Sequence, residues 1–204
     1  LNRSSDLQSF DEMVATNTLP LNEIMPNKEQ PRKTFDEGAL QELADSITQH
    51  GVLQPLLVRP LVTGGYQLVA GERRWRASRM AWLKEVPVVV KELSDVETME
   101  IAIIENLQRE DLNPIEEAEG LQALIDRCGF TQEEVATSVG KSRPAIANAL
   151  RLLKLPQEVR DMTKNGEISA GHARALLSFD NEAMIYEVAQ NIVKNNLTVR
   201  DVER

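Results

Sequence analysis

A short arginine-containing motif, Gly71-Glu72-Arg73-Arg74, has the residue types needed to bind phosphate. It follows an apolar run, Tyr66 to Ala70, and opens a segment of helical composition, so we expect it at a strand-to-helix turn. The first turn of a helix offers free backbone N–H groups and the positive end of the helix dipole, and glycine lets a ligand approach the backbone. The two arginines add bidentate donors for phosphate oxygens. The motif therefore predicts a phosphate site, although an arginine-rich first helical turn is more often only a solvated helix face.

Two further segments carry groups that bind phosphorylated ligands. The turn Gln30-Pro31-Arg32-Lys33-Thr34-Phe35 places another arginine just before a helix, and Glu105 with Asn106 places a carboxylate beside an amide on a later helix. The side chains of Glu105 and Asn106 supply hard oxygen donors of the type that hold a Mg²⁺ ion bridging phosphates. The alternative is that Glu105 pairs with Arg109, an exposed ion pair worth about 0.3–0.5 kcal/mol. The spacing leaves both interpretations open.

Residues Thr131 to Arg151 have the pattern of two helices joined by a tight turn. Ala136, Gly140 and Ile146 fit the small, turn and apolar positions of a helix-turn-helix. Recognition helices touch base edges near their N-termini, where Arg143 could bind guanine O6 and N7 together. A helical hairpin with no affinity for DNA has the same periodicity, so the pattern alone does not decide between them.

The first half of the chain is expected to form one small sheet, because short apolar runs there are bounded by turn residues. The expected strands are Leu19 to Ile24, Pro55 to Arg59, Tyr66 to Ala70 and Val86 to Val90. A helix is expected between Asp36 and His50-Gly51, and His50 is interpreted as a helix-end residue, not a ligand. A capping box, Ser94 to Glu97, opens the next helix.

From Asn113 onward the sequence predicts helices only. Asn113-Pro114 supplies a cap and a first-turn proline, and Thr131 to Glu134 forms a second capping box. Later helices are expected at Pro156 to Asn165, Ser169 to Leu177 and Asn181 to Asn195. We therefore predict an α+β, mostly helical protein: a tail over residues 1–18, a small-sheet domain with the candidate phosphate site over 19–110, and an all-α helix-turn-helix domain over 111–204.

The net charge of −9 is unfavourable for binding nucleic acid, since affinity for DNA depends on neutralising phosphates with lysine and arginine. The charge is unevenly distributed. Residues 95–134 hold twelve acidic and two basic residues, whereas residues 141–174 hold seven basic and three acidic. A DNA-facing surface is therefore expected in the second of these regions.

The composition, with 42% hydrophobic and 27% charged residues, is typical of a globular protein and argues against a fibrous or disordered chain. The longest apolar runs, such as Val86 to Val90, are far shorter than the roughly 20 residues that cross a bilayer. Cys128 is the single cysteine and is expected to fill core space in a reducing compartment. Because the chain begins at Leu1 without methionine, we expect a trimmed chain whose natural N-terminus lies upstream.

Four motifs in order closely resemble the nucleotide-binding domain of the ParB family of partitioning proteins. They are Gln30 to Phe35, Gly51-Val52-Leu53-Gln54-Pro55, Gly71-Glu72-Arg73-Arg74-Trp75-Arg76-Ala77 and Glu105-Asn106-Leu107-Gln108-Arg109. The resemblance implies a weak CTPase that acts as a molecular switch: CTP with Mg²⁺ closes a dimer around DNA, and slow hydrolysis helps to reopen it. It implies that Glu105 is catalytic, that Glu105 and Asn106 hold the metal, and that the nucleotide is bound by Gln30, Arg32, Gln54, Gly71, Glu72, Arg73, Arg74, Glu105 and Asn106.

The resemblance continues through Gly140 to Pro144, Leu152 to Pro156 and Gly171 to Leu177. It implies binding to double-stranded DNA at a palindrome called parS. The implied DNA-binding residues are Lys141, Ser142, Arg143, Asn148, Ala149, Lys154, Gly171 and His172. The alternative for His172 is that it caps the helix that follows it.

A close relative of ParB, the nucleoid occlusion factor, reads a different palindrome. Arg143, Ala149 and Gly171 resemble the ParB choice at the positions that separate the two, whereas Lys154 resembles the occlusion factor's choice. The resemblance therefore favours parS by three positions to one.

The remaining expectations follow from the resemblance alone. A C-terminal dimerisation domain would follow Arg204, a segment that stimulates a ParA-type ATPase would precede Leu1, and SMC condensin is a further expected partner. A cytoplasmic, nucleoid-associated location is expected. Two alternatives belong to other classes: a helix-turn-helix repressor that needs no nucleotide and keeps Arg73 and Arg74 as surface charges, and a phosphotransferase, for which no nucleophile stands beside Gly71.

Overall fold

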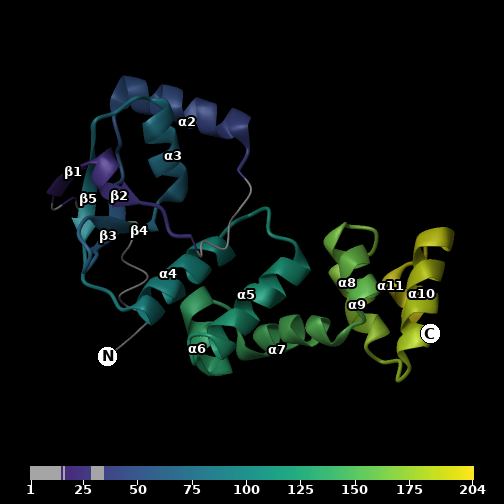
Figure 1. Cartoon of the computed structure of the whole chain (residues 1–204). Coiled ribbons are helices and arrows are strands. Elements are labelled where there is room, and N and C mark those ends of the chain that lie inside the picture. The colour runs from purple at the N-terminus through teal and green to yellow at the C-terminus, as the bar shows by residue number, and fades with distance from the viewer. Residues whose placement is uncertain (1–14, 16, 29–34) are drawn as a thin grey trace. The chain divides into compact units, whose positions relative to one another are not determined.

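The computed structural model describes residue 15, residues 17–28 and residues 35–204 (Figure 1). The chain divides into two compact units, Leu1–Asn106 and Leu107–Arg204. The first unit combines a small sheet with helices, and the second contains helices only, as the fold-class prediction states. The domain boundary at residues 110 and 111 stays a prediction.

The sheet of the first unit has five strands in the order β1-β5-β3-β4-β2. The strands are β1 (Asn17–Pro20), β2 (Ile24–Met25), β3 (Leu56–Pro60), β4 (Tyr66–Ala70) and β5 (Glu85–Val90). Strand β3 pairs antiparallel with β4 and parallel with β5, while β1 is antiparallel to β5 and β2 is parallel to β4. The expected single sheet is confirmed.

The expected single strand over Leu19 to Ile24 is wrong. The 3-10 helix η2 (Leu21–Glu23) divides this segment, so that β1 ends before it and β2 begins after it. The two strands lie at opposite edges of the sheet, and the chain must therefore leave one edge and cross to the other. Pro20 lacks an N–H group, which is tolerated at the end of an edge strand.

The core of the first unit lies on both faces of the sheet, because successive strand residues point to opposite sides. On one face, Leu56 and Val58 pack with Trp75 of helix α3 (Glu72–Met80). On the other face, Leu57 and Val69 are joined by Ile101 of helix α4 (Asp95–Leu107). The helices therefore hold the sheet from opposite sides.

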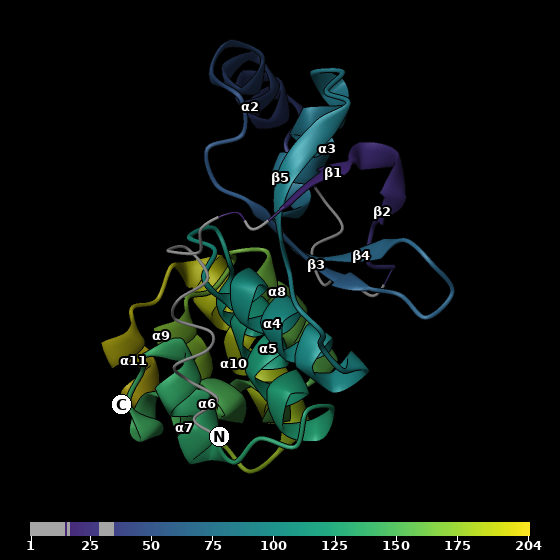
Figure 2. The same cartoon turned by 90° about the vertical axis from the view of Figure 1, so that its left-hand side faces the viewer.

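Helix α2 (Glu37–His50) lies beside α3 in both views (Figures 1 and 2). The two helices pack through Ala44, Ile47 and Ala77. Its ends confirm the sequence signals: the Asp36 side chain accepts hydrogen bonds from the first turn, and Gly51 ends the helix at φ 73°. The capping box of α4 is also confirmed, since Ser94 and Glu97 bond each other's backbone N–H groups.

The second unit is built from seven α-helices over residues 107–204: α5 (Pro114–Asp126), α6 (Gln132–Val139), α7 (Arg143–Arg151), α8 (Gln157–Lys164), α9 (Ala170–Leu176), α10 (Glu182–Asn195) and α11 (Val199–Glu203). A 3-10 turn, η3 (Leu152–Lys154), follows α7. One apolar cluster of the core joins Ile115 of α5 to buried residues of η3 and of helices α8 to α11, as far as Val202. Cys128 is buried and makes no disulfide, which confirms its assignment as a core residue.

Helix α11 was not predicted, although the sequence contains the capping box that begins it. Thr198 and Asp201 form a capping box, with each side chain bonded to the other's backbone N–H group. These hydrogen bonds from Thr198 hold the pKa of Asp201 below its usual value. Within the described residues, no helix is long and apolar enough to span a membrane.

Replacing Asp36 with alanine should lower the free energy of unfolding of the first unit by about 1 kcal/mol, because two first-turn N–H groups of α2 lose their acceptor. The chain has two tryptophans, Trp75 and Trp82, and both lie in this unit, so urea unfolding followed by tryptophan fluorescence reports on it alone. Asp36→Asn keeps an acceptor and is the matched control. An equal loss in both variants would contradict the capping role.

Candidate nucleotide and DNA sites

The turn between β4 and α3 brings backbone N–H groups to an open helix end. Gly71 has φ 102°, a conformation that L-residues rarely adopt, and a Cβ there would lie 2.8 Å from Leu56 Cδ2. Helix α3 starts at the next residue with no side-chain cap. The first-turn N–H groups are thus left for a ligand, and the positive end of the helix dipole favours an anion there.

Arg74 fastens this turn to the loop that carries Gln54. Its Nη1 donates to the backbone oxygens of Gln54, at 2.9 Å, and Pro55, at 2.8 Å. The motifs Gly51 to Pro55 and Gly71 to Ala77, which are apart in the sequence, are therefore brought together. The carbonyl partners could not be read from the sequence, because they lie about 20 residues away along the chain.

Glu72 is a buried carboxylate, only 5% exposed. Its Oε1 accepts a hydrogen bond from Arg76 Nε at 3.1 Å, while its Oε2 is buried with no hydrogen-bond partner among the described residues. The Arg76 guanidinium also lies over the ring of Phe35, 4.1 Å from its centroid. A buried acceptor without a donor is unfavourable by roughly 1–3 kcal/mol, so this oxygen is suited to a donor that arrives with a ligand.

Arg73, unlike Arg74, is not used to hold the fold together. Its side chain is exposed and forms no ion pair within the described part of the chain, so it can reach a ligand without breaking a contact of the fold. Gln30 and Arg32, the other predicted nucleotide contacts on the N-terminal side, lie outside the described residues.

Glu105 and Asn106 lie at the C-terminal end of α4, which packs on the sheet through Ile101. The Oε2 atom of Glu105 is shielded from solvent. Arg109, the alternative partner of Glu105, makes a two-pronged ion pair with Asp111, in which Nη2 lies 2.8 Å from Oδ2. No group of three or more potential protein ligands for a metal occurs among the described residues, so the magnesium assignment stays a prediction.

Helices α6 and α7 form the expected hairpin around Gly140. This residue has φ 70° and ends α6, and the Ser142 hydroxyl accepts from the Ala145 N–H to cap α7. Val135 and Ile146 are fully buried where the two helices pack. The confirmed capping box at Thr131 fixes the start of the hairpin.

The N-terminal end of α7 is open to solvent. Lys141, Ser142, Arg143 and Asn148 are exposed, Ala149 is half-buried, and Lys154 is exposed at the end of η3. The Lys141 ammonium forms an ion pair with Glu117 of α5, a partner that the sequence did not reveal. Arg143 makes no ion pair within the described residues, so its guanidinium can reach a base without competition.

His172 has a structural role that matches the capping alternative. Its Nδ1 lies 2.8 Å from Ser169 Oγ and accepts from the Ser169 N–H, which makes Nε2 the donor to the Leu197 carbonyl at 2.8 Å. The ring thus joins the start of α9 to the segment before α11. Its neighbour Gly171 has little free space, since a Cβ there would lie 3.1 Å from Val199 Cγ2. Contact of either residue with DNA stays a prediction.

The two units define a helix-turn-helix protein preceded by a small-sheet domain with a helix N-terminus open to an anion. The family model described as the ParB N-terminal domain matches residues 4–107, and that described as the ParB HTH domain matches residues 110–204. The chain belongs to the ParB family.

Similar proteins agree with this assignment. The chain is 58% identical to the chromosome-partitioning protein Spo0J of Thermus thermophilus over 91% of its own length and 68% of the relative's. It is 52% identical to the chromosome-partitioning protein ParB of Myxococcus xanthus, covering 91% of this chain and 62% of that protein. The truncated ParB of Caulobacter crescentus, solved in complex with the centromeric parS site, is similar with a TM-score of 0.80 and 45% identity, over 92% of this chain and 97% of that one.

Replacing Arg74 with alanine should destabilise the first unit by about 1.5–3 kcal/mol, because a charged donor leaves two carbonyl oxygens. Arg73→Ala is the matched control and should change the stability by less than about 0.5 kcal/mol, since it removes an exposed side chain. Urea unfolding followed by tryptophan fluorescence measures both. Equal effects would show that Arg74 does not hold the loop.

Proposed function

We propose that this chain is the DNA- and nucleotide-binding part of a chromosome-partitioning protein, and that it binds a parS-type palindrome. The observation that carries the proposal is the similarity, with a TM-score of 0.80 at 45% identity, to a ParB solved on its parS site. The two curated relatives are named chromosome-partitioning proteins, and the chain spans 68% and 62% of their lengths.

DNA recognition would be centred on the start of α7. The exposed Arg143 guanidinium presents paired donors of the geometry that binds guanine O6 and N7. Lys141 would exchange its partner Glu117 for a backbone phosphate, so the free chain holds this lysine in a neutral pair until DNA arrives. Binding to the site of the nucleoid occlusion factor is the second candidate, which Lys154 favours.

The first unit would bind CTP at the N-terminus of α3. The uncapped N–H groups, the freedom of Gly71 and the exposed Arg73 supply donors for the triphosphate. Arg74 keeps the Gln54 loop beside that turn, and Gln30 and Arg32 would complete the site. Selection of cytosine over other bases is a property we propose from family membership alone.

Mg²⁺ would be held by Glu105 and Asn106 together with phosphate oxygens, because magnesium keeps several waters and needs few protein ligands. When bound, the ion neutralises charge that develops on the phosphates. The buried Oε2 of Glu72 can accept a hydrogen bond from a water or a hydrated ion at the helix start. Glu105 would position the group that attacks the phosphate, which gives slow CTP hydrolysis.

The wider role would be that of a switch. CTP would bring the first units of two copies together into a clamp on DNA, and hydrolysis would help to reopen it. A ParA-type ATPase and SMC condensin are the proposed protein partners, and the nucleoid in the cytoplasm is the proposed location. These assignments rest on membership of the ParB family.

Arg143→Ala should abolish the preference for a parS palindrome over scrambled DNA, at a cost of about 1–3 kcal/mol per half-site. Arg73→Ala should leave initial palindrome binding intact, because it lies in the other unit. Fluorescence anisotropy with both DNAs at a fixed salt concentration measures this. If both variants lost site preference equally, the division of tasks between the units would be wrong.

Calorimetric titration should show tighter binding of CTP with Mg²⁺ than of ATP, GTP or UTP. Glu105→Gln should still bind CTP but hydrolyse it much more slowly, since it keeps the size of the side chain and removes its charge. Release of phosphate measures turnover. Equal affinity for all four nucleotides would favour a repressor that needs no nucleotide, and unchanged hydrolysis would remove Glu105 from the catalytic role.

A further inference from the structure

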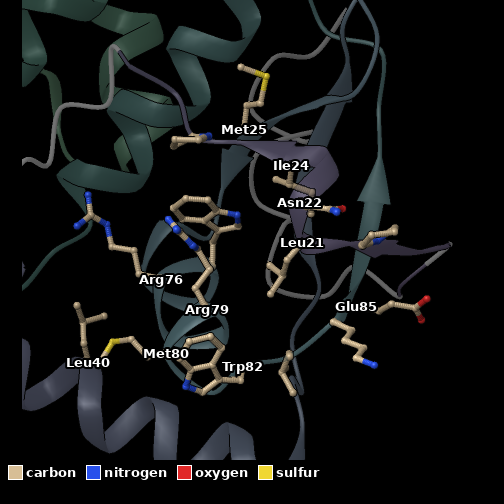
Figure 3. A pocket seen from close by; sticks show the side chains of 15 residues that line it. Leu21, Asn22, Ile24, Met25, Leu40, Arg76, Arg79, Met80, Trp82 and Glu85 are labelled. Carbon is tan, nitrogen blue, oxygen red and sulfur yellow. The ribbon is translucent and has the colours of Figure 1, made fainter.

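A groove of about 1230 Å³ lies in the first unit, beside the middle and the C-terminal end of α3. Figure 3 shows Arg76 and Arg79 of α3 on one side and Leu21 and Ile24 on the other. Trp75 also lines it. Among the described residues, none of the predicted nucleotide or DNA sites lines this groove.

Trp82, on the rim of the groove, is held in an unfavourable backbone conformation. It follows the last turn of α3 with φ 58°, the left-handed region in which a residue with a side chain is disfavoured by roughly 1–2 kcal/mol relative to glycine. Trp82 is 90% exposed. Its conformation ends α3, because the N–H groups of Trp82 and Leu83 donate to the carbonyl oxygens of Arg79 and Ser78. An exposed aromatic side chain of this kind is typical of binding surfaces.

Two methionines extend the apolar surface around Trp82. Met25 is 51% exposed and Met80 is 40% exposed, and both line the groove. Methionine is unbranched and polarisable, so it adapts to a bound apolar side chain. Apolar side chains gathered in one groove indicate a binding site, whereas scattered ones do not.

The wall of the groove also holds a hydrogen-bond donor without an acceptor. Trp75 is 6% exposed, and its Nε1 is buried with no partner among the described residues. A buried indole N–H usually finds an acceptor, and its absence costs roughly 1–3 kcal/mol.

The charges around the groove are basic although the chain carries −9. Arg79 and Lys84 are exposed, and the Arg79 guanidinium lies 4.9 Å from the centroid of the Trp75 ring. Arg76 is already paired with Glu72. Glu85 is the one acidic residue among the described side chains that line the groove, so these side chains favour an anionic occupant.

We propose that this groove binds an acidic amphipathic segment of a partner protein. Apolar side chains of the segment would pack on Trp82, Met25 and Met80, and its carboxylates would pair with Arg79 and Lys84. The groove is larger and more open than the roughly 300–1,000 Å³ pockets that enclose small molecules, which favours a peptide. A concave surface also suits a chain segment better than a lipid bilayer.

The test uses the whole chain and two synthetic amphipathic peptides of about 15 residues. One carries leucine and phenylalanine at helical spacing with glutamate and aspartate elsewhere, and the other has lysine in place of every acid. The acidic peptide should bind and change the fluorescence of Trp82, and the basic one should bind at least tenfold more weakly. No binding of the acidic peptide up to about 1 mM, or equal binding of both, would overturn the proposal.

Three variants separate docking from folding. Trp82→Gly should weaken acidic-peptide binding at least tenfold without lowering the melting temperature, because glycine relieves the backbone strain. Lys84→Glu should weaken the acidic peptide and strengthen the basic one. Val62→Ser removes a fully exposed apolar residue outside the groove and should change nothing.

Two further outcomes would assign the groove to a different occupant. Binding of the chain to anionic phospholipid vesicles that Trp82→Gly abolishes would make the groove a membrane contact. Self-association in sedimentation that the same variant abolishes would make it a contact between copies of this chain. Either result would overturn the partner-protein assignment while leaving the nucleotide and DNA sites untouched.

Discussion

The close approach of the Gly71 backbone to the Leu56 side chain is the constraint on which the first unit depends. A Cβ at this position would lie 2.8 Å from Leu56 Cδ2, and φ is 102°. Because the chain can make this turn, β4 passes directly into α3 while Leu56 stays fully buried in the sheet. The same absence of a side chain leaves the first N–H groups of α3 open. The packing of the core and the candidate phosphate site therefore arise from one residue.

Two basic side chains near the candidate sites are already bound in ion pairs with acidic residues of this chain. Lys141 pairs with Glu117, and Arg76 pairs with Glu72. The Lys141 pair is partly exposed and contributes little to stability, about 0–1 kcal/mol, so it can be exchanged for a ligand at small cost, whereas the Glu72 carboxylate of the other pair is buried. Arg73 and Arg143 make no such pair within the described residues, which makes them the most direct candidates for contacts with phosphate and with a base.

The sequence predicted best the features that depend on neighbours along the chain. The caps at Asp36, Ser94, Asn113 and Thr131 were found because each needs only residues two or three positions away. The division of Leu19 to Ile24 into two strands was missed, because sheet order decides it and the partners lie far along the chain. For the same reason the carbonyls bound by Arg74 and the Leu197 carbonyl bound by His172 gave no sequence signal. The short α11 was missed although its capping box is local.

Helix α3 connects the two candidate binding surfaces of the first unit through one side chain. Arg76 lines the groove, donates to Oε1 of Glu72 and lies over Phe35. The helix has nine residues and is about 13 Å long, so the groove and the Gly71 turn are separated by no more than the length of this one short helix. A carboxylate bound in the groove could pair with Arg76 in place of Glu72. The buried Glu72 would then lose the one hydrogen-bond donor described for it. Such coupling is reciprocal. If a ligand in the groove changes the affinity of the Gly71 turn for phosphate, phosphate at the turn must change the affinity of the groove by the same factor.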